Sequence, residues 1–166
     1  MNAFKRIIFV SNEDRTRGPM AATIMNYLLK EKESSFLIES RGMIVLFPEP
    51  YSPKAVEAAK LRDMNLPSTF SRQLSEDDFG KDTLVLTMEA SQKDKIYRKF
   101  PEARNVFTLC EFAGEGDTTI PNPYGGDEEK YRDTFDALYG IVFKAADALL
   151  GYKDTMREKT NTGGNQ

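Results

Sequence analysis

The sequence predicts an α/β fold: a single three-layer domain with a four-stranded parallel sheet and helices on both faces. Two observations lead to this class. Short apolar runs of the kind that form strands alternate along the chain with stretches of helical periodicity. These runs are apolar at consecutive positions, which is typical of parallel strands buried on both faces. The length of 166 residues suits one domain with its own core.

The first half of the chain is expected to contain two strands and two helices. Proline suits the first turn of a helix, so Pro19 and Pro53 mark helix starts, and Ser52 is the expected N-cap of the second helix. In order, the expected elements are a strand at 7–10, a loop at 11–18, a helix from Pro19, a strand at 36–38, a loop at 41–53 and a helix from Pro53 to about Asn65.

The second half continues the alternation and ends in a polar tail. The expected elements are a short capped helix opening at 75–78, a strand at 84–86, a helix at 91–100, a strand at 106–109, a loop at 113–127 and a final helix with an apolar stripe from Tyr131 to Leu149. The domain is therefore expected to span 1–152. The remainder, 153–166, is polar and aperiodic and is expected to be disordered.

Composition excludes several kinds of chemistry. The chain has no histidine, so Ser-His-Asp catalysis, Cys-His catalysis and His-ligated metal sites are excluded. The single cysteine, Cys110, cannot form an internal disulfide or a cysteine zinc site, and its place at the end of an apolar run predicts a buried side chain. We therefore expect no metal and no cofactor, with any acid–base step assigned to Asp, Glu, Lys or Tyr.

Charge and hydropathy bear on partners and location. A net charge of −3 argues against non-specific binding to nucleic acid or to a membrane surface. The first apolar run, 7–10, is too short for a signal peptide or a membrane span, so a cytoplasmic location is expected.

The loop after the first strand is the expected ligand site, because parallel sheets bind ligands at the carboxyl ends of their strands. The run 9–21 reads FVSNEDRTRGPMA. It resembles, without gaps, the signature loop of the low-molecular-weight protein tyrosine phosphatases: Phe-Val-Cys, five residues, then Arg, Ser, Pro, Met, Ala. Further landmarks follow in the family's order over about residues 4–150: SRG at 40–42, SRQL at 71–74, LVLTM at 84–88 and IPNPY at 120–124 in place of the Asp-Pro-Tyr motif.

The resemblance implies a flavodoxin-like phosphatase fold and a phosphate cradle built from backbone N–H groups ahead of a helix. In the family a cysteine thiolate attacks phosphorus, an arginine clamps the phosphoryl oxygens, and an aspartate acts as general acid. Here the nucleophile position holds Ser11, the clamp is Arg17, and the general-acid position holds Asn122. A serine hydroxyl without a histidine base is a poor nucleophile, and an amide cannot donate and recover a proton.

The resemblance therefore implies that this chain is a degenerate member of the family and resembles a pseudophosphatase. A cysteine-to-serine replacement by experimenters would explain Ser11 alone, whereas the departures from the family pattern at 13, 14, 18 and 122 favour natural divergence. The expected ligand-binding residues are Asn12, Glu13, Asp14, Arg15, Thr16, Arg17, Gly18 and Tyr124, with Tyr51 in a second loop that would flank the pocket.

Three functions stay open at this stage. The first is binding of a phosphorylated protein or a small anion without turnover. The second is a weakly active phosphomonoester hydrolase, in which Glu13 or Asp14 could serve as base or nucleophile. The third is a protein-interaction domain whose pocket is closed by an ion pair from Arg17 to Glu13 or Asp14. Asn122 is also open to a simpler interpretation as a turn residue before proline.

Overall fold

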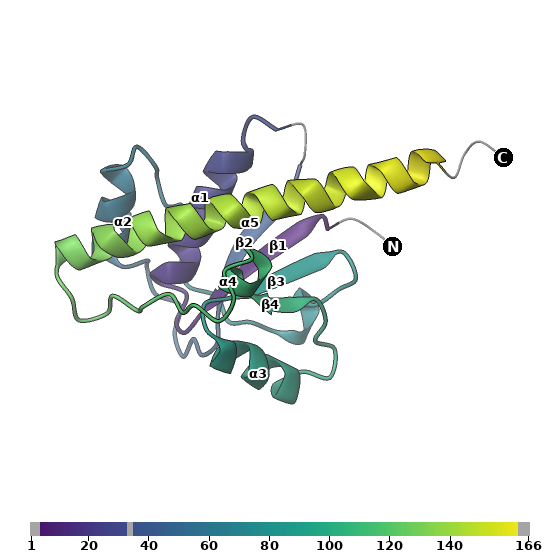
Figure 1. Ribbon diagram of the computed structural model, residues 1–166. Helices are drawn as coiled ribbons and strands as arrows, with labels where there is room; N and C mark the ends of the chain where they lie inside the picture. The colour runs from purple at the N-terminus through teal and green to yellow at the C-terminus, as the bar shows by residue number, and fades with distance from the viewer. Residues whose placement is uncertain (1–3, 33–34, 163–166) are drawn as a thin grey trace.

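In the part of the chain that the structure describes, four strands and six helical segments follow one another, and all except a short helix after the fourth strand come in the order that the sequence predicts (Figure 1). The computed structural model describes residues 4–32 and 35–162. The elements are β1 (Arg6–Ser11), α1 (Arg17–Leu29), β2 (Leu37–Gly42), α2 (Pro53–Lys60), the 3₁₀ helix η1 (Glu76–Asp78), β3 (Thr83–Thr87), α3 (Ala90–Lys99), β4 (Val106–Thr108), α4 (Leu109–Phe112) and α5 (Glu128–Thr162).

The sheet is parallel throughout, with strand order β2-β1-β3-β4. From the central strand β1 the chain passes first to β2 on one side, and later to β3 on the other. The carboxyl end of β1 is therefore the point at which the strand order reverses, where such sheets form a crevice. Ser11 is the last residue of β1 and pairs in register with Gly42 at the end of β2.

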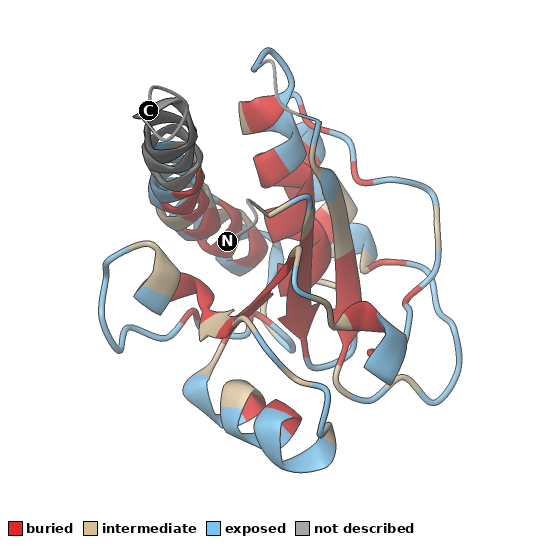
Figure 2. Ribbon diagram, turned by 90° about the vertical axis from the view of Figure 1, so that its right-hand side faces the viewer, coloured by how far each residue is buried: buried red, intermediate tan, exposed pale blue. Residues whose placement is uncertain are grey.

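Consecutive residues of β1 face opposite layers, as expected for a strand buried on both sides. Ile7 and Phe9 pack in the larger core cluster together with residues of α1, α2, α4 and α5. Ile8 and Val10 pack in the smaller cluster on the other face, where Ile96 of α3 covers the sheet. Buried residues concentrate along the strands and on the inner sides of the helices (Figure 2). The predicted three-layer class is confirmed.

Among the element boundaries that differ from the sequence prediction, two have a reason in a local hydrogen-bond motif. α2 ends at Lys60 rather than near Asn65, because Asp63 takes a left-handed conformation (φ 58°) and the N–H groups of Asp63 and Met64 donate to the carbonyls of Lys60 and Ala59. These two bonds are those of a Schellman motif, which terminates a helix.

The second difference lies at Cys110, which belongs to α4 and not to the end of a strand. β4 stops at Thr108, whose hydroxyl accepts a hydrogen bond from the Glu111 N–H at 3.0 Å. The sequence signal was present, since T-x-x-E at 108–111 is a capping-box pattern. The Cys110 side chain is buried, as predicted.

The final helix runs further than the predicted domain boundary. α5 begins at Glu128 and continues to Thr162, beyond residue 152, so 153–162 belongs to the helix, while residues 163–166 lie outside the described part of the chain. Among the helices that the structure describes, none is both long enough and apolar enough to cross a membrane.

Candidate anion site

A cavity of about 110 Å³ opens over the loop that joins β1 to α1. It brings together two segments that are more than a hundred residues apart, the loop itself and the stretch before α5. The lining residues are Ser11, Asn12, Glu13, Arg15, Thr16, Arg17, Asn122 and Tyr124. All of these were expected at the site, whereas the expected residues Asp14 and Gly18 are not among those that line it.

Arg17 begins α1 and is only 2% exposed. Its Nη1 donates to Glu89 Oε1 and to the carbonyl oxygen of Ile120, each at 2.8 Å. Its Nη2 is buried and has no hydrogen-bond partner among the described residues. The ion pair that would have closed the pocket, from Arg17 to Glu13 or Asp14, is not formed; Glu89 holds the guanidinium and leaves one nitrogen available.

Ser11 supplies a second buried donor. Its hydroxyl is likewise without a partner in the described part of the chain. The hydroxyl lies close to Gly18, where an added Cβ would stand 2.8 Å from Ser11 Oγ. Glycine at position 18 therefore leaves room for this hydroxyl at the start of α1. Two unpartnered donors, a guanidinium N–H and an O–H, thus belong to residues that line the same cavity.

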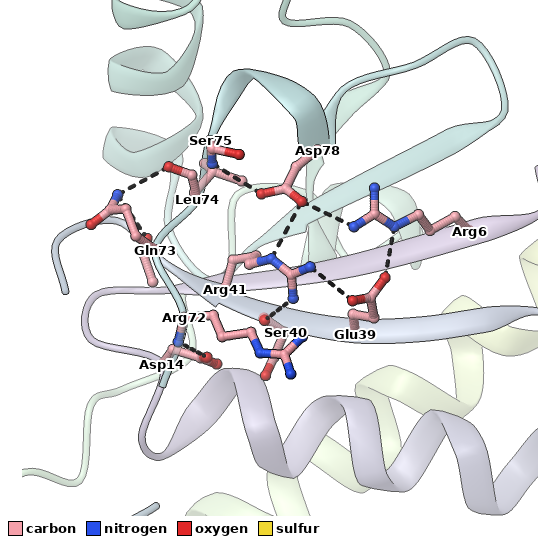
Figure 3. Close-up of polar contacts among 11 residues, drawn as sticks. Arg6, Asp14, Glu39, Ser40, Arg41, Arg72, Gln73, Leu74, Ser75 and Asp78 are labelled. Atoms are coloured by element: carbon pink, nitrogen blue, oxygen red, sulfur yellow. Dashed lines mark hydrogen bonds and ion pairs between the residues drawn. The ribbon is translucent and has the colours of Figure 1, made fainter. Parts of the chain in front are cut away.

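Asp14 does not line the cavity, and its carboxylate points toward Arg72 and Ser40 at the end of β2 (Figure 3). Its backbone is left-handed (φ 56°), and its Oδ2 accepts a hydrogen bond from the Arg72 N–H at 2.9 Å. Burial raises the pKa of the Asp14 carboxyl from 3.8 to about 6, against the lowering effect of the Ser40 hydroxyl and the Arg72 backbone. Glu13, by contrast, lines the cavity and is exposed. Of the two carboxylates, only Glu13 is therefore placed to oppose an anion.

The end of β2 supports the loop from beneath. Gly42 packs so closely that an added Cβ would lie 3.0 Å from the backbone carbon of Glu13 and 3.1 Å from the Asp14 nitrogen. Behind it, Arg6 and Arg41 both pair with Glu39 and Asp78, at 2.7 to 3.3 Å, and join β1, β2 and η1 (Figure 3). The loop thus packs closely against the end of β2, and ion pairs join the elements β1, β2 and η1 on which it rests.

Two site residues that sequence reasoning missed lie just beyond β3. Glu89 holds Arg17, and Gln92 Nε2 donates to Asn12 Oδ1 at 2.7 Å. Gln92 Oε1 accepts from the N–H groups of Met88 and Glu89 at 2.9 and 3.0 Å, which fixes the amide. The available signal was a polar E-x-x-Q pair directly after a buried strand, at the same sheet edge as the loop.

The far wall of the cavity is open and polar. Asn122 Oδ1 accepts a hydrogen bond from the Tyr124 N–H at 3.2 Å, so the amide forms the turn that the simpler interpretation expects. Tyr124 is 79% exposed at the cavity. Tyr51 does not flank it as expected; it is buried and lines a separate cavity with Ser40 and Arg41. Arg15 reaches the loop before α2, where its Nε donates to the Pro50 carbonyl at 2.9 Å.

Comparison with known proteins identifies the family. The model of the low molecular weight phosphotyrosine protein phosphatase family matches residues 6–155. The chain belongs to this family. A curated relative in the same family, the low molecular weight protein-tyrosine-phosphatase PtpB of Staphylococcus haemolyticus, is 33% identical over 141 residues, which are 84% of this chain and 96% of the relative.

Solved structures of YwlE arginine phosphatases share the fold. The YwlE arginine phosphatase from Geobacillus stearothermophilus superposes with a TM-score of 0.80 at 29% identity, covering 90% of this chain and 95% of that chain. A cysteine-to-serine mutant of YwlE arginine phosphatase, with its active-site serine phosphorylated, gives a TM-score of 0.81 at 29% identity, covering 87% and 95%. The single domain with a four-stranded parallel sheet is thus the family fold.

Proposed function

We propose that this family member binds a phosphorylated protein or a small phosphate-like anion over the loop 11–17 and does not turn it over. The observation that carries the proposal is the pair of buried donors, Arg17 Nη2 and Ser11 Oγ, on one cavity. More than about nine in ten buried polar groups in proteins have a hydrogen-bond partner, so two orphans at one cavity suit an acceptor-rich ligand. The N-terminus of α1 adds favourable dipole and backbone N–H groups.

The loss of turnover rests on the residues at positions 11 and 122. By the family pattern, Ser11 occupies the place of the cysteine nucleophile, and Asn122 that of the general acid. No carboxylate accepts a hydrogen bond from Ser11 Oγ among the described residues, so the hydroxyl lacks a base. A general acid–base group contributes about 10²–10⁴-fold to rate, and the nucleophile is missing as well.

The alternative function, a protein-interaction domain whose pocket is closed by an ion pair, loses its main support. It required an ion pair from Arg17 to Glu13 or Asp14, whereas Arg17 pairs with Glu89 and Asp14 accepts from Arg72. The cavity in front of Arg17 is left open.

Isothermal calorimetry with inorganic phosphate and with p-nitrophenyl phosphate tests binding. We expect the wild type to bind both, Arg17→Ala to abolish binding, and Arg17→Lys to weaken it by about tenfold or more, because lysine keeps the charge but loses the planar fork. The matched control is Arg62→Ala, which removes an exposed arginine that pairs with Asp136 away from the cavity. Equal affinities for wild type and Arg17→Lys, or no binding of either anion by wild type, would overturn the proposal.

A second candidate function is stoichiometric phosphoryl transfer to Ser11. It is favoured by the phosphorylated active-site serine of the YwlE mutant. In such a step Ser11 Oγ forms a bond to phosphorus, the bond from phosphorus to the donor nitrogen or oxygen breaks, and the hydroxyl proton leaves with the donor group. The resulting phosphoserine would persist, because no group at 122 can activate water.

Intact mass spectrometry distinguishes this candidate from reversible binding. After incubation with a phosphoarginine peptide and removal of the peptide, transfer predicts one added phosphoryl group that Ser11→Ala prevents. Unchanged mass in the wild type, with calorimetric binding retained, would leave reversible binding as the function.

A further inference from the structure

A second and larger hollow adjoins the anion cavity. This groove, of about 990 Å³, runs between the loop at 43–49 and α3, and it shares Asn12 and Glu13 with the cavity over Arg17. A ligand seated in the cavity can therefore continue into the groove without leaving the surface.

One wall of the groove is apolar and exposed. Ile44, Leu46 and Phe47 are 65%, 83% and 78% exposed, and all three line it. Single exposed apolar side chains are ordinary, but three within four residues beside a hollow are typical of a binding surface.

The opposite wall is basic. Lys95, Arg98 and Lys99 project from α3 into the groove, and none of them forms an ion pair with the described residues. The groove acids Glu49 and Glu89 are already paired with Arg15 and Arg17. Glu13 is the remaining acid of the lining, so the unpaired charges favour an anionic partner although the whole chain carries −3.

We infer that this groove binds an acidic and apolar segment of a phosphorylated protein, whose phosphoryl group enters the Arg17 cavity. The inference rests on the proposed function and names the class of partner. A peptide fits better than a lipid surface because the occupant must follow the groove to Asn12 and Glu13, which also line the cavity, and a planar bilayer cannot enter such a hollow. Apolar side chains would pack on Leu46 and Phe47, and carboxylates would pair with the α3 cations.

Fluorescence anisotropy with designed peptides tests the inference. The probe is a fluorescein-labelled peptide with a central phosphotyrosine flanked on both sides by leucine and glutamate. Its matched forms are the same peptide without phosphate and a phosphorylated peptide with lysine in place of glutamate. The wild type is expected to bind the acidic phosphopeptide about tenfold more tightly than the basic one, since each exposed charge pair contributes modestly and three act together.

Two sets of substitutions locate the effect. Lys95→Gln, Arg98→Gln and Lys99→Gln together should abolish the preference for the acidic peptide, and Leu46→Ser with Phe47→Ser should weaken both phosphopeptides. Neither set should change affinity for inorganic phosphate. The matched control, Lys30→Gln with Lys32→Gln and Lys60→Gln, removes three exposed cations outside the groove and should leave all affinities unchanged.

The outcomes separate this inference from the proposed function. Equal binding of acidic and basic phosphopeptides, with phosphate binding intact, would contradict the role inferred for the groove and leave the proposed function standing. If phosphate does not bind, binding of the unphosphorylated acidic peptide that the α3 substitutions weaken still supports the assignment of the groove. Tight binding of phosphatidylserine vesicles through Leu46 and Phe47, with no preference among the peptides, would assign the surface to a membrane and overturn the inference.

Discussion

Arg17 shows how one side chain can be both structural and available. Nη1 is saturated by Glu89 and the Ile120 carbonyl, which fixes the guanidinium and ties the stretch before α5 to the loop. Nη2 has no partner among the described residues. The arginine is thus oriented before an anion binds. Binding therefore loses less side-chain entropy than it would if a mobile arginine had to be ordered.

Glu89 sets the charge that an anion meets. Its carboxylate contacts Arg17 at 2.8 Å and so partly neutralises the clamp. Replacing Glu89 by Gln keeps a hydrogen-bond acceptor for Nη1 and removes the negative charge. We expect Glu89→Gln to raise phosphate affinity severalfold, on the order of 1 kcal/mol, measured by calorimetry at low salt. A fall in affinity would mean that Glu89 acts mainly by positioning Arg17.

The buried carboxyl of Asp14 makes the stability of the folded protein depend on pH. Its folded-state pKa, about 6, lies above the ordinary 3.8, so the folded protein holds this proton more tightly than the unfolded chain does. The resulting stabilisation is complete below about pH 4 and is lost as pH rises through 6. At neutral pH the charged carboxylate is buried at a cost of roughly 1–3 kcal/mol.

Asp14→Asn should therefore stabilise the protein at neutral pH. Asparagine tolerates the left-handed backbone and keeps an oxygen for the Arg72 N–H. In urea titrations we expect the free energy of unfolding to rise by about 1–3 kcal/mol near pH 7.5, and the gain to be about 1 kcal/mol smaller near pH 5. A gain that does not depend on pH would show that the ionisation of Asp14 is not its source.

The residues that the sequence located and those it missed differ in kind. Ser11, Arg17 and Asn122 occupy fixed places in a motif, so they could be predicted to share one site, and all three line the cavity. The partnership of Arg17 with Glu89 and the burial of Asp14 beside Arg72 depend on tertiary contacts with the N-cap of α3 and with the stretch near Arg72. No spacing along the chain encodes those distances.

At the scale of elements, the loop is shaped by the end of β2. Gly42 leaves space for the Val45 side chain, which an added Cβ would approach to 2.5 Å, and for the backbone of Glu13 and Asp14, which it would approach to 3.0 and 3.1 Å. We expect Gly42→Ala to destabilise the fold by about 1–3 kcal/mol and to weaken phosphate binding, because the loop must move to accept the methyl group.

The control for this change is Gly140→Ala in α5. No atom lies within 4 Å of the added methyl group there, so it should be neutral or stabilising by up to about 1 kcal/mol, without effect on binding. Chemical denaturation and calorimetry on both variants check the pair. Unchanged phosphate affinity in Gly42→Ala would argue that β2 does not set the loop geometry.

Whether a segment forms a helix or a strand could be predicted where its hydrophobic pattern was strong. The residue at which α2 ends and α4 begins depended on local capping motifs. The buried strands and α1 followed from apolar runs and Pro19. α2 ended early because Asp63 adopted a conformation usually left to glycine, and α4 formed because Thr108 capped a turn. In both cases a local hydrogen-bond motif outweighed the continuation of a hydrophobic pattern.

At the scale of the whole molecule, the fold was predictable because three signals agreed: strand–helix alternation, strands apolar on both faces, and a motif that required a strand before it and a helix after it. The four-stranded order β2-β1-β3-β4 then places the loop 11–17 at the switch point. The resulting molecule keeps the fold of its phosphatase family, and the proposed loss of turnover depends on Ser11 and Asn122.

We propose that this fold binds phosphate and lacks only the nucleophile and the general acid that would cleave the bond from phosphorus to the leaving group. The most direct test is release of nitrophenol from p-nitrophenyl phosphate by the wild type beside Ser11→Cys, Asn122→Asp and the double variant. We predict no release above buffer by the wild type or Asn122→Asp, slow release by Ser11→Cys, and about 10²–10⁴-fold faster release by the double variant. Release by the wild type that Arg17→Lys abolishes, or a double variant that binds phosphate and stays inactive, would contradict the claim.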